Sequence, residues 1–368
     1  MIKDDLFALF VDFHQNSLPV HSLNFGVITL IPKKDNANKI QDYRPICLLN
    51  VSFKIITKVL TNRIGLVADK IVSPSQTAFM PGRNILEGVI ILHESIHGLQ
   101  RKKLDGVILK LDFEKAYDKV KWEFLQQALR MKGFSPSWCA WIHTIVSGGH
   151  VRVKVNDGRG PFFSTFKGLR QGDPLSPILF NIVVDMLAIL FARAKEVNLF
   201  KGIVPHLIPE GLSILQYADD TVVFLDHNLG HARNVKLLLT LFEQMLGLKI
   251  NFHKSELFCY GLAKEYEVQY SHLFGCGIGT MPFKYLGIPM THRRLRNSDW
   301  QGVIDRFEKR LSTWKAKFLS SGGRLVLLNS LLSSLPIFIM SFFKIPEREM
   351  CPWAISKCFG DLVSNTSA

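Results

Sequence analysis

Apolar positions along the chain follow two periods, which alternate irregularly. Residues 26–34, GVITLIPKK, form a β-rich run that ends in paired lysines, and residues 151–156, VRVKVN, alternate as a half-exposed strand. Between these runs the spacing predicts an amphipathic helix from residue 52 onward and another over residues 122–133, which ends at a glycine. No internal repeat or long linker is visible, so we expect one intertwined α+β unit.

Two apolar runs of strand type end in carboxylates. VILKLDFEKAYDKV, residues 107–120, breaks into charge at Asp112, and ILQYADDTVVFL, residues 214–225, predicts a β-hairpin with Asp219 and Asp220 as its two-residue tip. Adjacent like charges raise each other's pKa and weaken the fold unless a cation neutralises them. A solvated acidic turn is the competing interpretation, but the apolar flanks favour a metal site.

The ligands of such a metal site must come from more than one element. Asp112 ends a strand of similar apolar character 107 residues before Asp219, and neighbouring places in one sheet would bring the two carboxylates together. Mg²⁺ takes oxygen ligands and shares them with substrate phosphates, and Mn²⁺ is a possible substitute. Two such ions about 4 Å apart would support in-line phosphoryl displacement, which is nucleotidyl-transfer chemistry.

Composition narrows the class of partner. The chain has 368 residues, 47% of them hydrophobic, so it can bury a sizeable core in two or three subdomains. Its net charge of +14 favours a polyanion such as nucleic acid or an anionic membrane surface, although a merely soluble basic protein would also fit. The six cysteines form no C-x-x-C pair, which predicts neither a zinc site nor a disulfide framework and suits an intracellular compartment.

Two further segments need an interpretation. GLRQGDPLSP, residues 168–177, is a glycine-rich turn that we expect to place Pro174 in the first turn of the following apolar helix. Residues 325–343 carry no charge, but they include Asn329 and Pro336, so a core-packing helix is favoured over a membrane span. The first residues, MIKDDLFALFVDF, lack the pattern of a secretory signal.

Seven motifs in order resemble those of one polymerase family. LDFEKAYD, GLRQGDPLSPILFN, YADD, GLKINFHKSE and FKYLGIP are similar to the successive palm motifs of a reverse transcriptase. The upstream segments LIPKKDNANKIQDYRPICLLNVSFKIITKVLTNRI and QTAFMPGRNILEG resemble the fingers of LINE-type, non-long-terminal-repeat retrotransposons, and the phrasing is closest to plant elements. The resemblance covers residues 5–347.

The resemblance implies a right-hand polymerase with a mainly antiparallel palm sheet. It assigns residues 1–103 to the fingers, 104–290 to the palm and 291–347 to the thumb, with a reverse transcriptase domain over about 26–290 and a divergent tail over 348–368. In the thumb, basic side chains would meet the phosphates of the template–primer duplex: Arg306, Lys309, Arg310, Lys315, Lys317 and Arg324.

The resemblance also implies roles for single residues. Asp112, Asp219 and the backbone carbonyl of Phe113 would be metal ligands, supported by Asp220, and Lys254 would protonate departing pyrophosphate. The incoming nucleotide would meet two cationic side chains, with Lys34 as an alternative to the first, an aromatic steric gate and a glycine-rich loop: Lys33, Arg44, Tyr117, Gln171 and Gly172. A primer grip would comprise Phe283, Tyr285, Leu286 and Gly287.

The expected activity is RNA-directed DNA polymerisation, with an RNA template, a DNA primer and deoxynucleoside triphosphates as partners and no membrane. Full elements of this family also carry an endonuclease and downstream modules that the sequence does not show, so we expect a truncated insertion that needs a supplied primer end. A catalytically dead nucleic-acid-binding remnant is the alternative. Action in the nucleus follows from the resemblance alone.

Overall fold

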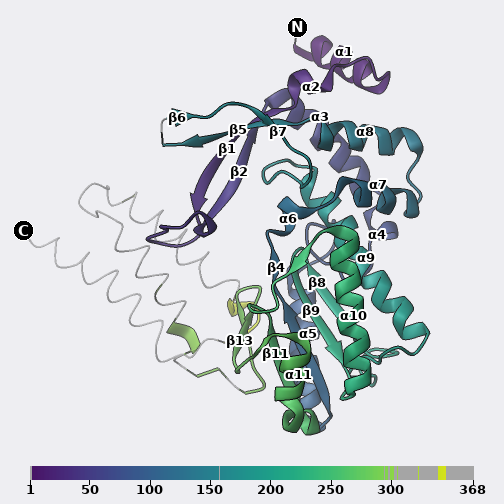
Figure 1. Ribbon diagram of the computed structural model, residues 1–368, viewed down its shortest axis with the longest axis vertical. Helices are drawn as coiled ribbons and strands as arrows, with labels where there is room; N and C mark the ends of the chain where they lie inside the picture. Colours follow the sequence, from purple (N-terminus) through teal and green to yellow (C-terminus); the bar gives the residue numbers. More distant parts are fainter. Residues whose placement is uncertain are drawn as a thin grey trace, which may run out of the picture. The chain divides into compact units, whose positions relative to one another are not determined.

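The structure is a computed structural model that describes residues 2–156, 158–293, 295–296, 299–301, 305, 322 and 339–344. The chain divides into two compact units, Met1–Thr280 and Met281–Ala368 (Figure 1). Most of the expected thumb, including its six basic residues, and the whole tail at 348–368 lie outside the described residues, as does most of the uncharged stretch at 325–343.

Two helices of the first unit lie close to the residues that the sequence predicts, from residue 52 and over residues 122–133. The predicted helix from residue 52 is α3, and Asn50 caps it by accepting a hydrogen bond from the backbone N–H of Ser52 at 2.9 Å. The α-helices are α1 (Ile2–His14), α2 (Val20–Leu23), α3 (Val51–Gly65), α4 (Ala68–Ile71), α5 (Ile85–Arg101), α6 (Ala116–Lys119), α7 (Trp122–Met131), α8 (Pro136–Ser147), α9 (Ser176–Glu196), α10 (Leu229–Leu246) and α11 (Glu267–Phe274). Short 3-10 helices span Ile40–Asp42 and Gly261–Tyr266.

A five-stranded, mainly antiparallel sheet forms the centre of the first unit, as expected for a palm. Its order is β12 (Gly277–Ile278), β11 (Glu256–Tyr260), β3 (Gly106–Leu111), β9 (Asp220–Leu225) and β8 (Ile214–Tyr217), and only the pair of β11 with β12 is parallel. β3 therefore lies between β11 and β9, antiparallel to both. Beside it, β4 (Phe113–Glu114) pairs with β10 (Lys249–Ile250).

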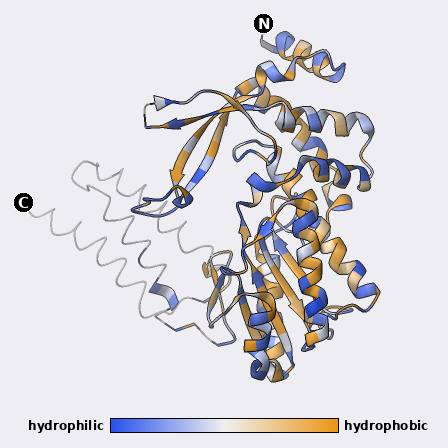
Figure 2. Cartoon of the chain, in the orientation of Figure 1, coloured by the Kyte–Doolittle hydropathy of each residue, from blue (hydrophilic) through white to orange (hydrophobic). Residues whose placement is uncertain are grey.

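Both faces of this sheet are buried. Leu109 and its neighbour Val223 belong to the main apolar cluster, which also contains the buried faces of α9 and α10. Ile108 and Phe224 point to the opposite face, where α5 contacts β8, and both are fully buried. Figure 2 shows the corresponding apolar colour along the central strands. Burial on both faces explains why these strands read as nearly continuous apolar runs.

A second sheet carries the segments expected in the fingers. β1 (Phe25–Pro32) forms an antiparallel hairpin with β2 (Tyr43–Leu49) and pairs in parallel with β5 (His150–Val155). β5 also pairs with β6 (Gly158–Arg159) and β7 (Phe163–Ser164). Strands from the range expected in the palm thus complete a sheet begun by the first 50 residues (Figure 1).

The second unit contains a small described hairpin. β13 (Phe283–Tyr285) pairs antiparallel with β14 (Ile288–Met290), and Tyr285 lies opposite Ile288. Leu286 and Gly287 form the two-residue turn, both with positive φ, 50° and 84°. The sequence assigns these residues to the palm, whereas the compact division of the chain falls between residues 280 and 281.

The structure corrects two local expectations. The two-residue turn of the 214–225 hairpin is Ala218–Asp219, not Asp219–Asp220, because Asp220 pairs with Tyr217 as the first residue of β9. Pro174 precedes α9, which begins at Ser176, and Pro177 occupies the first turn instead. Asp173 accounts for the later start, since its carboxylate accepts the backbone N–H of Leu175 at 3.0 Å and stabilises a turn before the helix.

The longest apolar helix of the described residues is α9. Within the described residues, one helix, α9, has the length and apolar composition to cross a membrane, and 72% of its most apolar window is buried inside the protein. A core helix of this kind has the same composition because it is surrounded by other apolar elements.

Candidate active site

Three carboxylates meet at one end of the central sheet. The antiparallel register pairs Leu111 with Thr221, so the next residue of the β3 chain, Asp112, lies opposite Asp220. Asp219 is the second residue of the hairpin turn and directly precedes Asp220. All three aspartates are exposed, unlike the apolar residues that hold them. The strand register therefore brings together carboxylates that are 107 residues apart in sequence.

The backbone on both sides of Asp112 is anchored. Its N–H donates to the Ser255 hydroxyl at 3.1 Å, and its carbonyl accepts the N–H of Asn251 at 2.7 Å. The Phe113 side chain is buried against Phe242, with ring centroids 6.2 Å apart. These contacts leave the Asp112 carboxylate as the part of the residue that faces solvent.

Neighbouring charges raise and lower the pKa values of the site carboxylates. Partial desolvation by the surrounding protein raises the pKa of Asp112, the Lys254 ammonium lowers it, and the Asp219 charge raises it again. Burial, followed by the Asp219 charge, also raises the pKa of Asp220. Lys110 lowers the pKa of both groups, because it lies two residues before Asp112 and so shares its side of the strand. Mutual repulsion of this kind favours binding of a cation.

The donor set fits a hard divalent cation that is shared with a substrate. Within the described residues, no three His, Cys, Asp or Glu side chains form a ready-made metal cluster. Mg²⁺ rarely needs such a cage, since it usually takes one or two carboxylates together with water and phosphate oxygens. The exposed carboxylates of Asp112 and Asp219 suit that mode of binding.

Lys33 and Lys34, the two alternative lysines of the β1–β2 hairpin, have different contacts. The Lys34 ammonium forms an ion pair with Asp42 at 2.9 Å. The Lys33 ammonium donates to the Gln41 carbonyl at 3.0 Å, and its charge lowers the pKa of both Asp112 and Asp118. Lys33 is therefore the lysine of this pair whose charge reaches the carboxylates.

Tyr117 has a fixed ring beside the carboxylates. It stacks on Phe180 of α9, with centroids 4.3 Å apart and an interplanar angle of 13°. Burial raises the pKa of its hydroxyl, and the Asp219 charge raises it further. The ring is thus held within electrostatic range of Asp219 by a partner that the sequence did not indicate.

Gln171 and Gly172 lie against a strand of the second sheet. The Gln171 carbonyl accepts the N–H of Cys47 in β2 at 2.7 Å. Gly172 has φ +110°, and a Cβ there would lie 2.6 Å from the Cys47 carbonyl oxygen. Close backbone approach therefore requires glycine at this position, whether or not a nucleotide is bound.

The other predicted site residues lie in β2 and in the β13–β14 hairpin. Arg44 is exposed in β2 opposite Ile31, and no contact in the described structure joins it to the carboxylates. The four primer-grip residues lie in the second unit, where Phe283 and Tyr285 are buried and Leu286 and Gly287 form the turn.

Comparison with known proteins decides the family. Residues 31–290 match the family model described as "Reverse transcriptase (RNA-dependent DNA polymerase)". The chain belongs to the reverse transcriptase family. It is a reverse transcriptase domain with a right-hand polymerase fold.

Relatives of this reverse transcriptase come from transposable elements. It is 27% identical over 327 residues to the transposon TX1 uncharacterized 149 kDa protein of Xenopus laevis, covering 88% of this chain and 24% of that protein. It is 28% identical over 283 residues to the Retrovirus-related Pol polyprotein from type-2 retrotransposable element R2DM of Drosophila melanogaster, covering 74% and 25%. The chain thus spans about a quarter of the length of these relatives.

A solved structure shares the fold of this reverse transcriptase. Apo telomerase from Candida tropicalis superposes with a TM-score of 0.51 at 13% identity, covering 98% of this chain and 66% of that one.

Several residues of the reverse transcriptase site escaped sequence reasoning. Arg170, beside the glycine-rich loop, is almost buried over the Phe53 ring at 4.9 Å and lies 3.6 Å from Asp173. Burial raises the pKa of Asp173 and lowers that of Arg170. A two-residue strand period could have identified Lys110, but Phe180 and Arg170 are recognised only through contacts between distant segments.

Proposed function

We propose that this reverse transcriptase extends a DNA primer on an RNA template by two-metal nucleotidyl transfer. The observation that carries the proposal is the convergence of Asp112, Asp219 and Asp220 at one end of the central sheet, within range of the Lys33 and Lys254 charges. Exposed carboxylates beside two lysines suit a triphosphate that arrives with its own metal ion.

The metal ions would be Mg²⁺, with Mn²⁺ as a substitute. Bound between the substrate and Asp112, Asp219 and the Phe113 carbonyl, two such ions would lower the pKa of the primer 3′-hydroxyl and neutralise the leaving pyrophosphate. Asp220 supports the pair by adding negative charge next to Asp219. The apolar core beneath fixes the spacing of the carboxylates.

Side chains around the carboxylates orient the nucleotide. Lys33 and Arg44 bind the triphosphate, and Gln171 contacts the nucleotide and template from the loop that Gly172 seats on β2. Tyr117, braced by Phe180, excludes a ribose 2′-hydroxyl by its bulk. Lys254, exposed and close enough to influence Asp112, donates a proton to departing pyrophosphate.

Residues of the second unit and of the thumb would hold the template–primer duplex. The turn of Leu286 and Gly287, with Phe283 and Tyr285 beneath it, supports the primer end, and the basic thumb residues contact phosphates without reading sequence. Plant origin and nuclear action are parts of this proposal that follow from the motif resemblance.

The decisive experiment measures Mg²⁺-dependent incorporation of dTTP on poly(rA) primed with oligo(dT). The parent chain should extend the primer, and Asp219→Asn should abolish extension. Asp226→Asn is the matched control, because Asp226 follows the opposite end of β9, about 20 Å from the site by strand length, and should leave extension unchanged.

Two other outcomes would contradict the proposal. Extension that survives in Asp219→Asn would show that the carboxylates are not the catalytic centre. No extension by the parent, with salt-sensitive duplex binding retained, would identify the alternative, a nucleic-acid-binding remnant without polymerase activity.

A further inference from the structure

Residues 75–77, a loop in the range expected for the fingers, lie along the outer edge of the β8–β9 hairpin that carries Asp219 and Asp220. The Thr77 N–H donates to the Gln216 carbonyl at 3.0 Å, and the Gln216 N–H donates to the Ser75 carbonyl at 2.8 Å. Gln76 and Gln216 form an isolated parallel bridge. β8 would otherwise be the edge of the sheet, so residues 75–77 act as a short additional strand next to it.

The side chain of Gln76 reaches from this loop to the turn that carries Asp219. Gln76 is fully buried, and its Oε1 accepts the backbone N–H of Ala218 at 2.9 Å and that of Ala78 at 3.1 Å. The contact of Nε2 with the Ala218 carbonyl is longer, 3.5 Å, so Oε1 is the main anchor. One oxygen atom thus links the loop to the residue immediately before Asp219.

Ala218 needs this anchor for two reasons. Its φ of +53° is unfavourable for a residue with a Cβ, and such a conformation persists only where the surroundings enforce it. Ala218 is also buried, so without Gln76 its N–H would lose its acceptor away from water. The turn could then relax by rotating the peptide that leads into Asp219.

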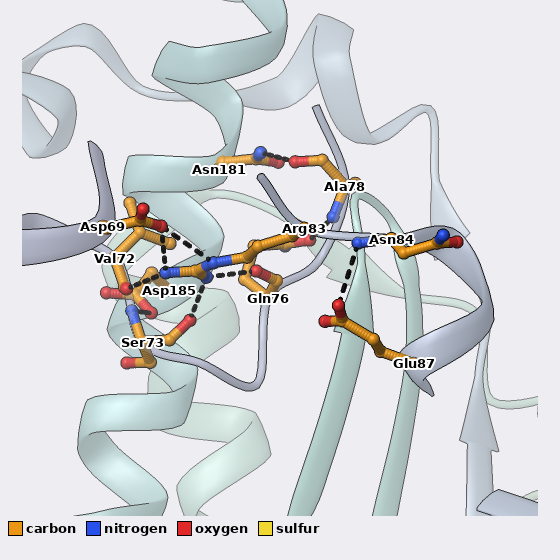
Figure 3. Close-up of polar contacts among 10 residues, drawn as sticks. All are labelled: Asp69, Val72, Ser73, Gln76, Ala78, Arg83, Asn84, Glu87, Asn181 and Asp185. Atoms are coloured by element: carbon orange, nitrogen blue, oxygen red, sulfur yellow. Dashed lines mark hydrogen bonds and ion pairs between the residues drawn. The ribbon is translucent and has the colours of Figure 1, made fainter. Parts of the chain in front are cut away.

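A polar network holds Gln76 in place (Figure 3). Arg83 donates to the Gln76 carbonyl at 2.5 Å, to the Ser73 carbonyl at 2.6 Å and to the Val72 carbonyl at 2.9 Å. Its guanidinium also lies 3.2 Å from Asp69. Three backbone carbonyls bound to one guanidinium fix the loop at Gln76 and at the residues that precede it.

The same loop is tied to α9. The buried Asp185 accepts the Ser73 N–H at 2.8 Å, and Asn181 donates to the Ala78 carbonyl. The loop is therefore attached to the core helix at both ends, and Gln76 transmits that position to the hairpin turn.

We propose that Gln76 is a positioning residue for Asp219: its Oε1 holds the Ala218 peptide so that the Asp219 carboxylate faces the metal site. The inference rests on the proposed function, but it concerns the geometry of the metal ligand, which can be measured without catalysis. Removal of groups that orient a metal ligand typically weakens metal affinity or activity about 10–100-fold.

The test compares Gln76→Met, which keeps the volume and removes the acceptor, with Gln76→Glu, which keeps the acceptor. Asn228→Ala is the control for general destabilisation, because it removes the N-terminal cap of α10, whose carbonyl Oδ1 accepts the Gly230 N–H at 2.8 Å. Three quantities are measured: Mn²⁺ affinity by electron paramagnetic resonance with template–primer duplex present, kcat and KM for dTTP at saturating Mg²⁺, and Tm.

For Gln76→Met we expect Mn²⁺ affinity and kcat to fall about 10–100-fold with KM for dTTP nearly unchanged. Gln76→Glu should keep Mn²⁺ affinity at or above that of the parent, and Asn228→Ala should lower only Tm. If Gln76→Met does not fold, Gln76→Asn, whose shorter side chain cannot reach Ala218, should show the same loss.

Equal Mn²⁺ affinity and kcat in the parent and Gln76→Met would overturn the inference, as would losses no larger than those of Asn228→Ala. A parent chain that binds Mn²⁺ but does not extend primers would refute the polymerase proposal alone. In that case the difference in Mn²⁺ affinity between the parent and Gln76→Met still decides the role of Gln76.

Discussion

At the scale of single residues, the protonation state of Asp112 depends on a balance of opposing neighbours. Burial and the Asp219 charge raise its pKa, whereas Lys254, Lys110 and Lys33 lower it. A metal ligand must be ionised, so each lysine extends the working range of the site toward acid. In the proposed function Lys33 would also attract the triphosphate, which would link substrate binding to the charge state of the ligand.

Replacing Lys254 tests this balance. Lys254→Met removes the largest pKa-lowering charge on Asp112, so the acid limb of log(kcat/KM) against pH should move to higher pH. Lys249→Met, on the neighbouring strand β10, is the control, because Lys249 acts on Glu114 and is not among the charges that shift Asp112. An acid limb that stays in place in Lys254→Met would contradict the assignment.

The Tyr117 ring should control the choice of sugar. Tyr117→Ala removes the ring that Phe180 holds in place, and incorporation of UTP relative to dTTP should rise about 10–100-fold, measured as the ratio of kcat/KM values. Tyr117→Phe keeps the ring and loses only the hydroxyl, so its sugar discrimination should match that of the parent. Equal discrimination in Tyr117→Ala would show that the ring is only a packing residue.

At the scale of elements, the glycine-rich loop joins the catalytic region to the sheet of β1 and β2. The Gln171 carbonyl pairs with the Cys47 N–H as an added backbone contact on β2, and Gly172 lies directly on the Cys47 carbonyl. Backbone contacts therefore set the position of this loop relative to the β1–β2 hairpin, which carries Lys33.

Gly172→Ala should break this junction. The new Cβ would meet the Cys47 carbonyl oxygen at 2.6 Å, and φ of +110° is a further strain, so we expect a loss of at least about 1–3 kcal/mol in unfolding free energy and of most polymerase activity. Gly133→Ala is the control, because Gly133 also has a positive φ, +84°, but no neighbour within 4 Å of an added Cβ. Urea unfolding and primer extension should show a smaller loss of stability in the control and no loss of activity.

At the scale of the whole molecule, sequence periodicity predicts the strands but not the long-range contacts that fix the turns at their ends. The apolar runs before Asp112 and around Asp219 predict the two strands, and the structure shows that these strands pair and bring the carboxylates together. The shift of the turn to Ala218–Asp219 could not be predicted, since the acceptor that stabilises Ala218 comes from Gln76, 142 residues away. Contacts of this range leave no local pattern.

The net charge of +14 predicts duplex binding that weakens with salt, and the thumb sequence predicts where the contacts lie. Replacing Lys309, Arg310 and Lys317 with glutamine lowers the charge from +14 to +11, since 14 − 3 = 11. Each phosphate contact contributes about 0.9 to the slope of log Kobs against log salt concentration, so the magnitude of the slope should fall by about 2–3. Fluorescence anisotropy of a labelled RNA–DNA duplex at several salt concentrations measures it.

A second triple variant separates local contact from overall charge. Arg101, Lys102 and Lys103 are exposed and precede β3, whose other end leads to Asp112 about 20 Å away, so changing them to glutamine gives the same net charge far from the site. The slope of this control should equal that of the parent. Equal reductions in both variants would mean that the duplex responds to the total charge of the chain, and the thumb would lose its assigned role.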